Sequence, residues 1–103
     1  MAISSTTLTT SAQSIFTSTG INGDAVTTMY LCNTSGITQT FTVYLVRAGH
    51  TASNNNIIYI TYPVTSTDTY VIQDRLLLGP GDSIQALASN ANGIVATVSS
   101  LSV

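Results

Sequence analysis

The run TQTFTVYLV, residues 38–46, alternates polar and apolar side chains with a period of two. Successive side chains of an extended strand point to opposite faces, so one face here carries Phe41, Val43 and Leu45. A helix would scatter these apolar residues around its circumference. The spacing therefore predicts a β-strand with one buried face.

The segment before this strand is a group of turn formers, Asn33-Thr34-Ser35-Gly36. It follows residues 25–32, which alternate less cleanly around Met29 and Leu31. Two strands separated by a compact turn predict a hairpin. Asn33-Thr34-Ser35 also fits the N-glycosylation pattern, but without a secretory signal we interpret it as a turn.

The rest of the chain repeats the same plan of short strands divided by turns. Further strands are expected at residues 13–19, 57–62, 68–73, 83–89 and 94–103. Residues 76–78 run into the turn Gly79-Pro80-Gly81-Asp82. About eight strands with a turn roughly every 12 residues predict an all-β antiparallel β-sandwich, jelly-roll or immunoglobulin-like.

Residues 57–62 are apolar on both faces, which indicates a strand that is central in its sheet or covered by a neighbouring chain. The predicted core consists of Ile15, Phe41, Val43, Leu45, Ile58, Ile60, Ile72, Leu78, Ile84 and Val98.

A length of 103 residues allows one domain, which we assign to residues 13–103. Residues 1–12 are uncharged and hydroxyl-rich, with Ile3 and Leu8 as isolated large apolar side chains. This segment is either an edge strand of its own sandwich or an N-terminal arm on a neighbouring subunit. We expect the arm, because an assembly component gains most by ordering a flexible segment at its contact.

The composition excludes several classes of function. Charged residues are 6% of the chain, against about 25% in an average soluble domain. Two arginines and no lysine make no basic patch, so no nucleic-acid partner is expected. The longest apolar runs are four residues, too short to cross a membrane. The N-terminal residues contain no secretory signal, so we expect synthesis in a cytoplasm.

No reactive site is expected. The block Gly81-Asp82-Ser83-Ile84 resembles the nucleophile block of GDSL-type hydrolases, but the single histidine, His50, lies upstream of it, and a β-turn explains it better. Cys32 ends a strand with no helix or cation near it, so we expect an inert thiol. The acidic residues show no ligand spacing. We predict no enzymatic activity, no metal and no cofactor.

The polar surface is instead built from hydroxyls, with 18 threonines and 13 serines in the chain. Such a surface can be buried without leaving charged groups unpaired, which suits a domain that packs against copies of itself or against a scaffold. The five tyrosines fit protein interfaces or the core, and a sugar-stacking platform is the weaker alternative. The expected assembly interface comprises Ile3, Leu8, Tyr44 and Tyr59.

Nearly the whole chain after residue 12 resembles small β-sandwich virion proteins of tailed bacteriophages. The resemblance rests on TTMYLCNTSG and TQTFTVYLV in residues 27–46, an Asn-rich loop before NIIYI, and DTYVIQDRLLLGPGDSIQALASNANGIVATVS with its L-x-x-GDSI-x-A turn. It implies a non-enzymatic structural component located in the virion. A single compact domain without a coiled coil favours a capsid decoration (cement) protein, with the major capsid protein or other virion proteins as partners and a homo-oligomeric state. The alternatives are a neck, tail or fibre component, or a sugar-binding module for host adsorption.

Overall fold

The computed structural model describes residues 2–19, 21–73 and 75–102, and Met1, Gly20, Asp74 and Val103 lie outside the described residues. Within these ranges the chain forms nine strands and no helix, which confirms the all-β prediction. The strands are β1 (Ala2–Thr7), β2 (Gln13–Thr17), β3 (Asp24–Asn33), β4 (Gln39–Val46), β5 (Ile57–Val64), β6 (Thr69–Ile72), β7 (Leu76–Leu78), β8 (Ser83–Ala88) and β9 (Ile94–Ser102).

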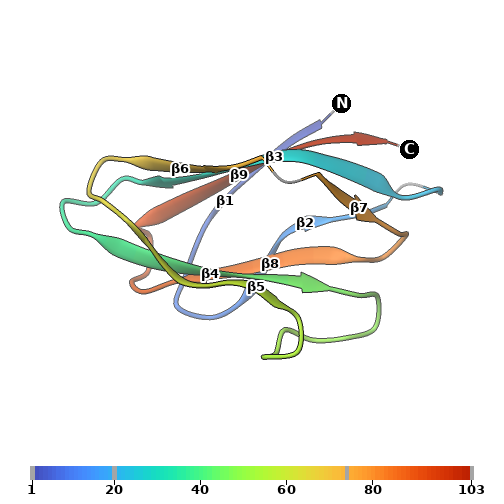
Figure 1. Ribbon diagram of the computed structural model, residues 1–103, viewed down its shortest axis with the longest axis horizontal. Coiled ribbons are helices and arrows are strands. Elements are labelled where there is room, and N and C mark those ends of the chain that lie inside the picture. Colours follow the sequence, from blue (N-terminus) through green and yellow to red (C-terminus); the bar gives the residue numbers. More distant parts are fainter. Residues whose placement is uncertain (1, 20, 74, 103) are drawn as a thin grey trace.

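The strands form two antiparallel sheets that pack face to face, with the five-stranded sheet above the four-stranded one in Figure 1. The five-stranded sheet has the order β1-β9-β3-β6, and β7 also pairs with β3. The four-stranded sheet has the order β2-β8-β4-β5. Apolar side chains from both inner faces fill the space between them.

The pairing is that of one long hairpin rolled into a sandwich. Strand β1 pairs with β9, β2 with β8, β3 with β6 and β7, and β4 with β5. Two further pairs complete the sheets: β3 with β9 in the five-stranded sheet and β4 with β8 in the four-stranded sheet. This is the jelly roll, so the strand order selects one of the two predicted sandwich types.

The predicted hairpin between residues 25–32 and 38–46 is wrong. Strand β3 belongs to the five-stranded sheet and β4 to the four-stranded sheet, so the turn at residues 34–38 carries the chain from one sheet to the other. Turn chemistry predicts that the chain reverses. It does not decide whether the second strand pairs with the first or crosses the sandwich.

The predicted core is largely confirmed. Seven of its members are buried: Ile15, Phe41, Val43, Ile72, Leu78, Ile84 and Val98. Leu45 is partly buried and packs against them. Ile58 and Ile60 were expected inside, and this is wrong: they lie on β5, at the edge of its sheet, with 39% and 66% of their surfaces exposed.

A β-bulge in β5 explains this error. Between the pair Phe41–Tyr62 and the pair Val43–Tyr59, β4 has one residue and β5 has two. The extra residue reverses the alternation, so Tyr59 and Tyr62, three positions apart, both reach the inner side and the Phe41 ring. Thr61 takes a φ of 46° at the bulge, and its N–H donates to Thr42 Oγ1 at 3.1 Å.

The N-terminal segment is the edge strand of its own sandwich. Strand β1 pairs with β9 over its whole length, from Ala2 opposite Ser100 to Thr7 opposite Val95. The expected arm along a neighbouring subunit is therefore not what the chain forms. The side chain of Leu8, just beyond β1, is fully buried in the core and fixes the segment in place.

Candidate functional site

The most distinctive surface of the molecule is the outer face of the five-stranded sheet. Cross-strand register places its side chains in four rows that run across the strands. The rows are Ser5–Thr97–Tyr30–Val71, Ile3–Ser99–Thr28, Thr7–Val95–Cys32–Thr69 and Leu101–Ala25–Leu77. We call these residues the outer face.

The period-two alternation of β3 and β9 creates this surface. Along β9, Ile94, Ala96 and Val98 point into the core, so the residues between them point outward. Along β3, Met29 and Leu31 do the same. The apolar inner face packs against the four-stranded sheet, and the outward residues are left for contacts outside the sandwich.

The outer face carries no charged side chain. Asp24 is buried, where its Oδ2 accepts a hydrogen bond of 2.7 Å from Ser18 Oγ. Arg47, Asp68 and Asp82 belong to loops and turns, and Arg75 lies between β6 and β7 at the rim. Within the described residues, the charged side chains are thus kept off the sheet face.

Large apolar side chains are concentrated on this face. Of the ten that are exposed within the described residues, five belong to it: Ile3, Tyr30, Val71, Leu77 and Leu101. Leu77 and Ile3 expose 74% and 73% of their surfaces. Strand spacing gives the face an area of roughly 500 Å². Exposed apolar side chains gathered on one face mark a candidate interaction site, so this face is the strongest candidate for contact with another protein.

The expected interface residues are distributed differently. Ile3 lies on the outer face, whereas the buried Leu8 is inaccessible to any neighbour. Tyr44 is half-buried on β4, in the other sheet. Tyr59 is half-buried and packs against the core cluster. The sequence reasoning missed Leu77, Leu101 and Val71, because only the register of three strands brings them to one surface.

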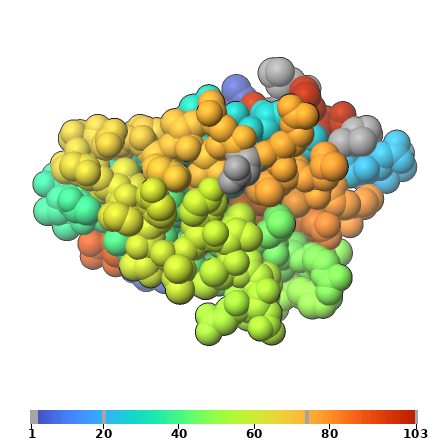
Figure 2. Space-filling model, in the orientation of Figure 1, coloured from blue at the N-terminus to red at the C-terminus, as the bar shows by residue number. Residues whose placement is uncertain are grey.

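The tyrosines do not form an open sugar-stacking platform. Tyr59, Tyr62 and Tyr70 pack with Phe41, and the rings of Tyr62 and Tyr70 have centroids 4.4 Å apart. The Tyr62–Tyr70 contact joins β5 to β6, whose segments lie at the front in Figure 2. The rings of this tyrosine cluster pack on one another at tilted or edge-on angles and do not lie in one open plane of the kind on which a sugar stacks.

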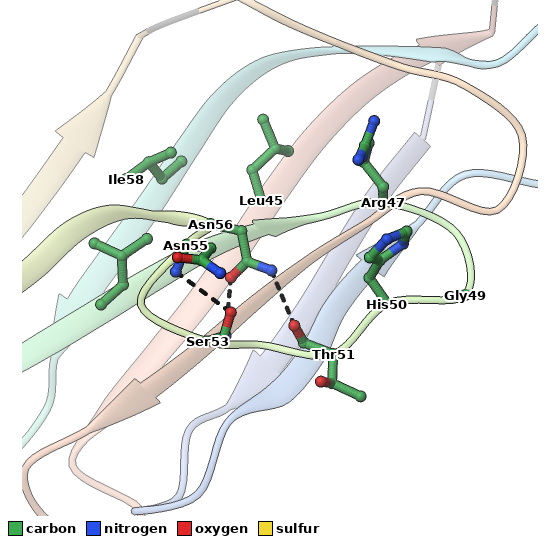
Figure 3. A pocket seen from close by; sticks show the side chains of 10 residues that line it. Leu45, Arg47, Gly49, His50, Thr51, Ser53, Asn55, Asn56 and Ile58 are labelled. Atoms are coloured by element: carbon green, nitrogen blue, oxygen red, sulfur yellow. Dashed lines mark hydrogen bonds between the residues drawn. The ribbon is translucent and has the colours of Figure 1, made fainter.

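A hollow of about 770 Å³, lined by polar loop residues and by Leu45, Ile57 and Ile58, lies beside the loop that connects β4 and β5 (Figure 3). Its polar groups are largely used within the loop itself. Asn56 Nδ2 donates to Thr51 O at 2.9 Å, Asn56 Oδ1 accepts from Ser53 N at 3.0 Å, and His50 Nδ1 lies 3.1 Å from Ala48 O. These bonds hold the loop in its shape.

The residues considered for catalysis are not brought together. Cys32 lies on the outer face, whereas His50 belongs to the loop below the other sheet. Ser83 is buried at the start of β8, and the preceding Asp82 closes the predicted turn with Gly81 at a φ of 87°. Within the described residues, no group of three or more metal-ligating side chains occurs. The same residues contain no helix long and apolar enough to cross a bilayer.

No family model matches the sequence, and no curated protein matches it either. Among solved structures, a chain from the structure of infectious bursal disease virus, Gx strain, aligns with 13% identity and a TM-score of 0.47 over 95% of this chain and 28% of the viral chain. A chain from the Gt strain aligns with 10% identity and a TM-score of 0.43 over 94% and 29%. This chain spans less than a third of each viral chain, and similarity of this degree carries no argument about function.

Proposed function

We propose that this protein is a non-enzymatic structural subunit of a larger assembly and that it docks through the outer face. The observation that carries the proposal is the concentration of five exposed apolar side chains on a sheet face without charge. A standard interface buries about 800 Å² on each partner. The outer face is smaller, which suits one of several contacts in an assembly better than an isolated stable dimer.

We further propose that the assembly is the virion of a tailed bacteriophage and that the chain is a capsid decoration (cement) protein. The support is the resemblance of residues 13–103 to small virion β-sandwich proteins, together with the jelly-roll topology, which is frequent in viral capsid domains. Its partners would be the major capsid protein or other virion proteins, and copies of itself. A neck, tail or fibre position is the alternative within the same particle.

A sugar-binding module for host adsorption is the alternative from another class. Jelly rolls also occur in lectin domains. The packed tyrosine cluster and the self-bonded loop at residues 47–56 do not favour it. No cofactor enters either proposal.

Particle composition tests the proposed position. The proteins of purified phage particles are separated on a gel, and an antibody against the purified chain identifies its band. The intensity of that band is compared with that of the major capsid protein. A decoration protein is expected in hundreds of copies, whereas an adsorption module is expected in few. Absence of the chain from particles would contradict the virion proposal.

Paired substitutions test the docking face. Leu77→Asp places a charge on the outer face, and Ile37→Asp places one on another exposed apolar position, in the β3–β4 connection. We expect Leu77→Asp to abolish binding to stripped particles and Ile37→Asp to leave it intact, because burying an unpaired carboxylate is costly. Equal binding by both variants would show that docking uses another surface.

A further inference from the structure

The two sheets have four edges, and natural β-proteins protect such edges against unwanted pairing. Three of the four edges here are protected by a recognisable device. Strand β5 has two register shifts against β4, a positive φ at Thr61, and Pro63, which has no N–H to donate. Strand β2 has a register shift between Ser14 and Phe16.

The third protected edge is divided. Strands β6 and β7 share one side of β3 but are only four and three residues long, and the chain is interrupted between them. Short edge strands offer few consecutive hydrogen-bonding groups to a partner.

Strand β1 has none of these devices. It is six residues long, contains no charge, glycine or proline, and keeps one uninterrupted register with β9. Among the described residues, its strand neighbour is β9 on one side alone. The opposite side of β1 is therefore a regular, uncharged edge.

The hydrogen-bonding direction of each residue follows from the ladder. Leu8 N donates to Ile94 O at 2.8 Å, and antiparallel pairs alternate along the strand. The backbone groups of Ser4 and Thr6 therefore face β9, and those of Ile3, Ser5 and Thr7 face the open edge. The Thr7 carbonyl accepts a hydrogen bond of 2.9 Å from Gln13 Nε2, which leaves Ile3 and Ser5 as the residues with both groups free for a new strand.

We propose that β1 pairs antiparallel with β1 of a second copy of this chain across a two-fold axis. The register that uses the free groups sets Ile3 opposite Ser5 of the partner subunit and Ser4 opposite Ser4 of the partner subunit. Each of the two hydrogen-bonded pairs exchanges two N–H···O bonds. The result is a continuous sheet of ten strands.

The charge pattern favours a second copy as the occupant. A two-fold axis through the Ser4 pair brings residues 3–5 near their own counterparts, so a charge at any of these positions would lie near a like charge. Strand β1 has no charge, and the net charge of the whole chain is only −2. The new contact also continues the outer face, because Ile3, Ser5 and Thr7 lie on it. Pairing joins two faces of roughly 500 Å² into one surface of about 1,000 Å².

Sedimentation velocity of the full chain tests this pairing. We expect reversible dimers. Ser5→Pro removes an N–H that points to the open edge while sparing the bonds to β9. It should raise the dissociation constant of the dimer at least about tenfold. Ser5→Ala retains the N–H and should leave the dimer unchanged. A wild-type chain that stays monomeric, or a Ser5→Pro dimer as tight as wild type, would overturn the proposal.

Hydrogen exchange on the wild-type chain gives a second readout that does not depend on a foldable variant. The Ile3 and Ser5 amides should become protected as concentration rises, while the Thr6 amide, bonded to β9, stays protected throughout. Protection of Ile3 and Ser5 that is independent of concentration would overturn the pairing. The β1 pairing is one contact within the proposed assembly, but it is inferred from strand geometry. Failure of the chain to dimerise would overturn this pairing alone, whereas absence of the chain from particles would overturn the proposed function.

Discussion

Asn33 and Val64 belong to different sheets, and a hydrogen bond of 2.9 Å joins the Asn33 Nδ2 to the Val64 carbonyl oxygen. The same amide group donates to Ile37 O at 2.8 Å, and Asn33 Oδ1 accepts from the N–H and the hydroxyl of Ser35. The side chain is fully buried with its donors and acceptor in use. It ties the crossing between the sheets to the end of β5, and it is not accessible for glycosylation in the folded chain.

Replacing Asn33 by Ala should destabilise the domain by about 1–3 kcal/mol, because the Val64 carbonyl loses its buried donor and the Ser35 N–H loses its acceptor. Urea unfolding followed by circular dichroism measures the change. Asn90→Ala, at an exposed turn position, is the control and should shift the midpoint very little. Equal midpoints for the two variants would contradict a structural role for the Asn33 amide.

Gly23 and Gly36 should respond oppositely to alanine. Gly23 has a φ of 91°, and an added Cβ would lie 2.1 Å from the Leu78 carbonyl oxygen. Gly36 has nothing within 4 Å of an added Cβ. We expect Gly23→Ala to lose about 2–4 kcal/mol through strain and overpacking. Gly36→Ala should stay within about 0.5 kcal/mol of wild type, and a larger loss there than at Gly23 would contradict the geometry.

Phe41 and Ile60 provide a test of the inward and outward sides of the four-stranded sheet. Phe41 is fully buried among three tyrosine rings, so Phe41→Ala should cost about 3–5 kcal/mol. Ile60 is 66% exposed, and Ile60→Ala should change stability by no more than about 0.5 kcal/mol. Thermal melting of the isolated chain compares them. A large loss for Ile60→Ala would mean that β5 turns that side chain inward.

Asp82 should control the order of two connections at once. Its Oδ1 accepts from Ala48 N at 2.9 Å and its Oδ2 from Gly79 N at 3.0 Å. In Asp82→Ala, both amides lose their acceptor, so their hydrogen exchange should accelerate. The Val43 amide in the core strand is the internal control and should not change. Unaltered exchange at Ala48 would show that the loop at residues 47–56 does not depend on this carboxylate.

The local character of the chain could be predicted from its sequence. The alternation in residues 38–46 predicts β4 to within one residue, since the structure begins it at Gln39. The turn at Gly79-Pro80-Gly81-Asp82 also forms as predicted. Both signals depend on a side chain's own preference and its nearest neighbours, which is information that a short stretch of sequence contains.

The bulge in β5 marks the limit of such reasoning. Ile58 and Ile60 are apolar and separated by one residue, as core residues of a strand often are. One register shift, opposite Thr42, turns Ile60 outward, and a second leaves Ile58 without a partner in β4, while Tyr59 and Tyr62 pack against Phe41. The bulge is set by how β5 fits against β4 and the aromatic cluster, which no pattern within β5 records.

By itself, the sequence determined the strand-forming class, most of the core, the turns and the low number of charged residues. Only the tertiary structure decided that consecutive strands cross between sheets, that residues 2–7 pair with β9, and that Leu77, Tyr30 and Ile3 share one face. The physical reason is distance along the chain. Strand pairing joins residues up to about the full chain length apart, as Ala2 and Ser100 are, and their register is set by the packing of the whole sandwich rather than by local preference.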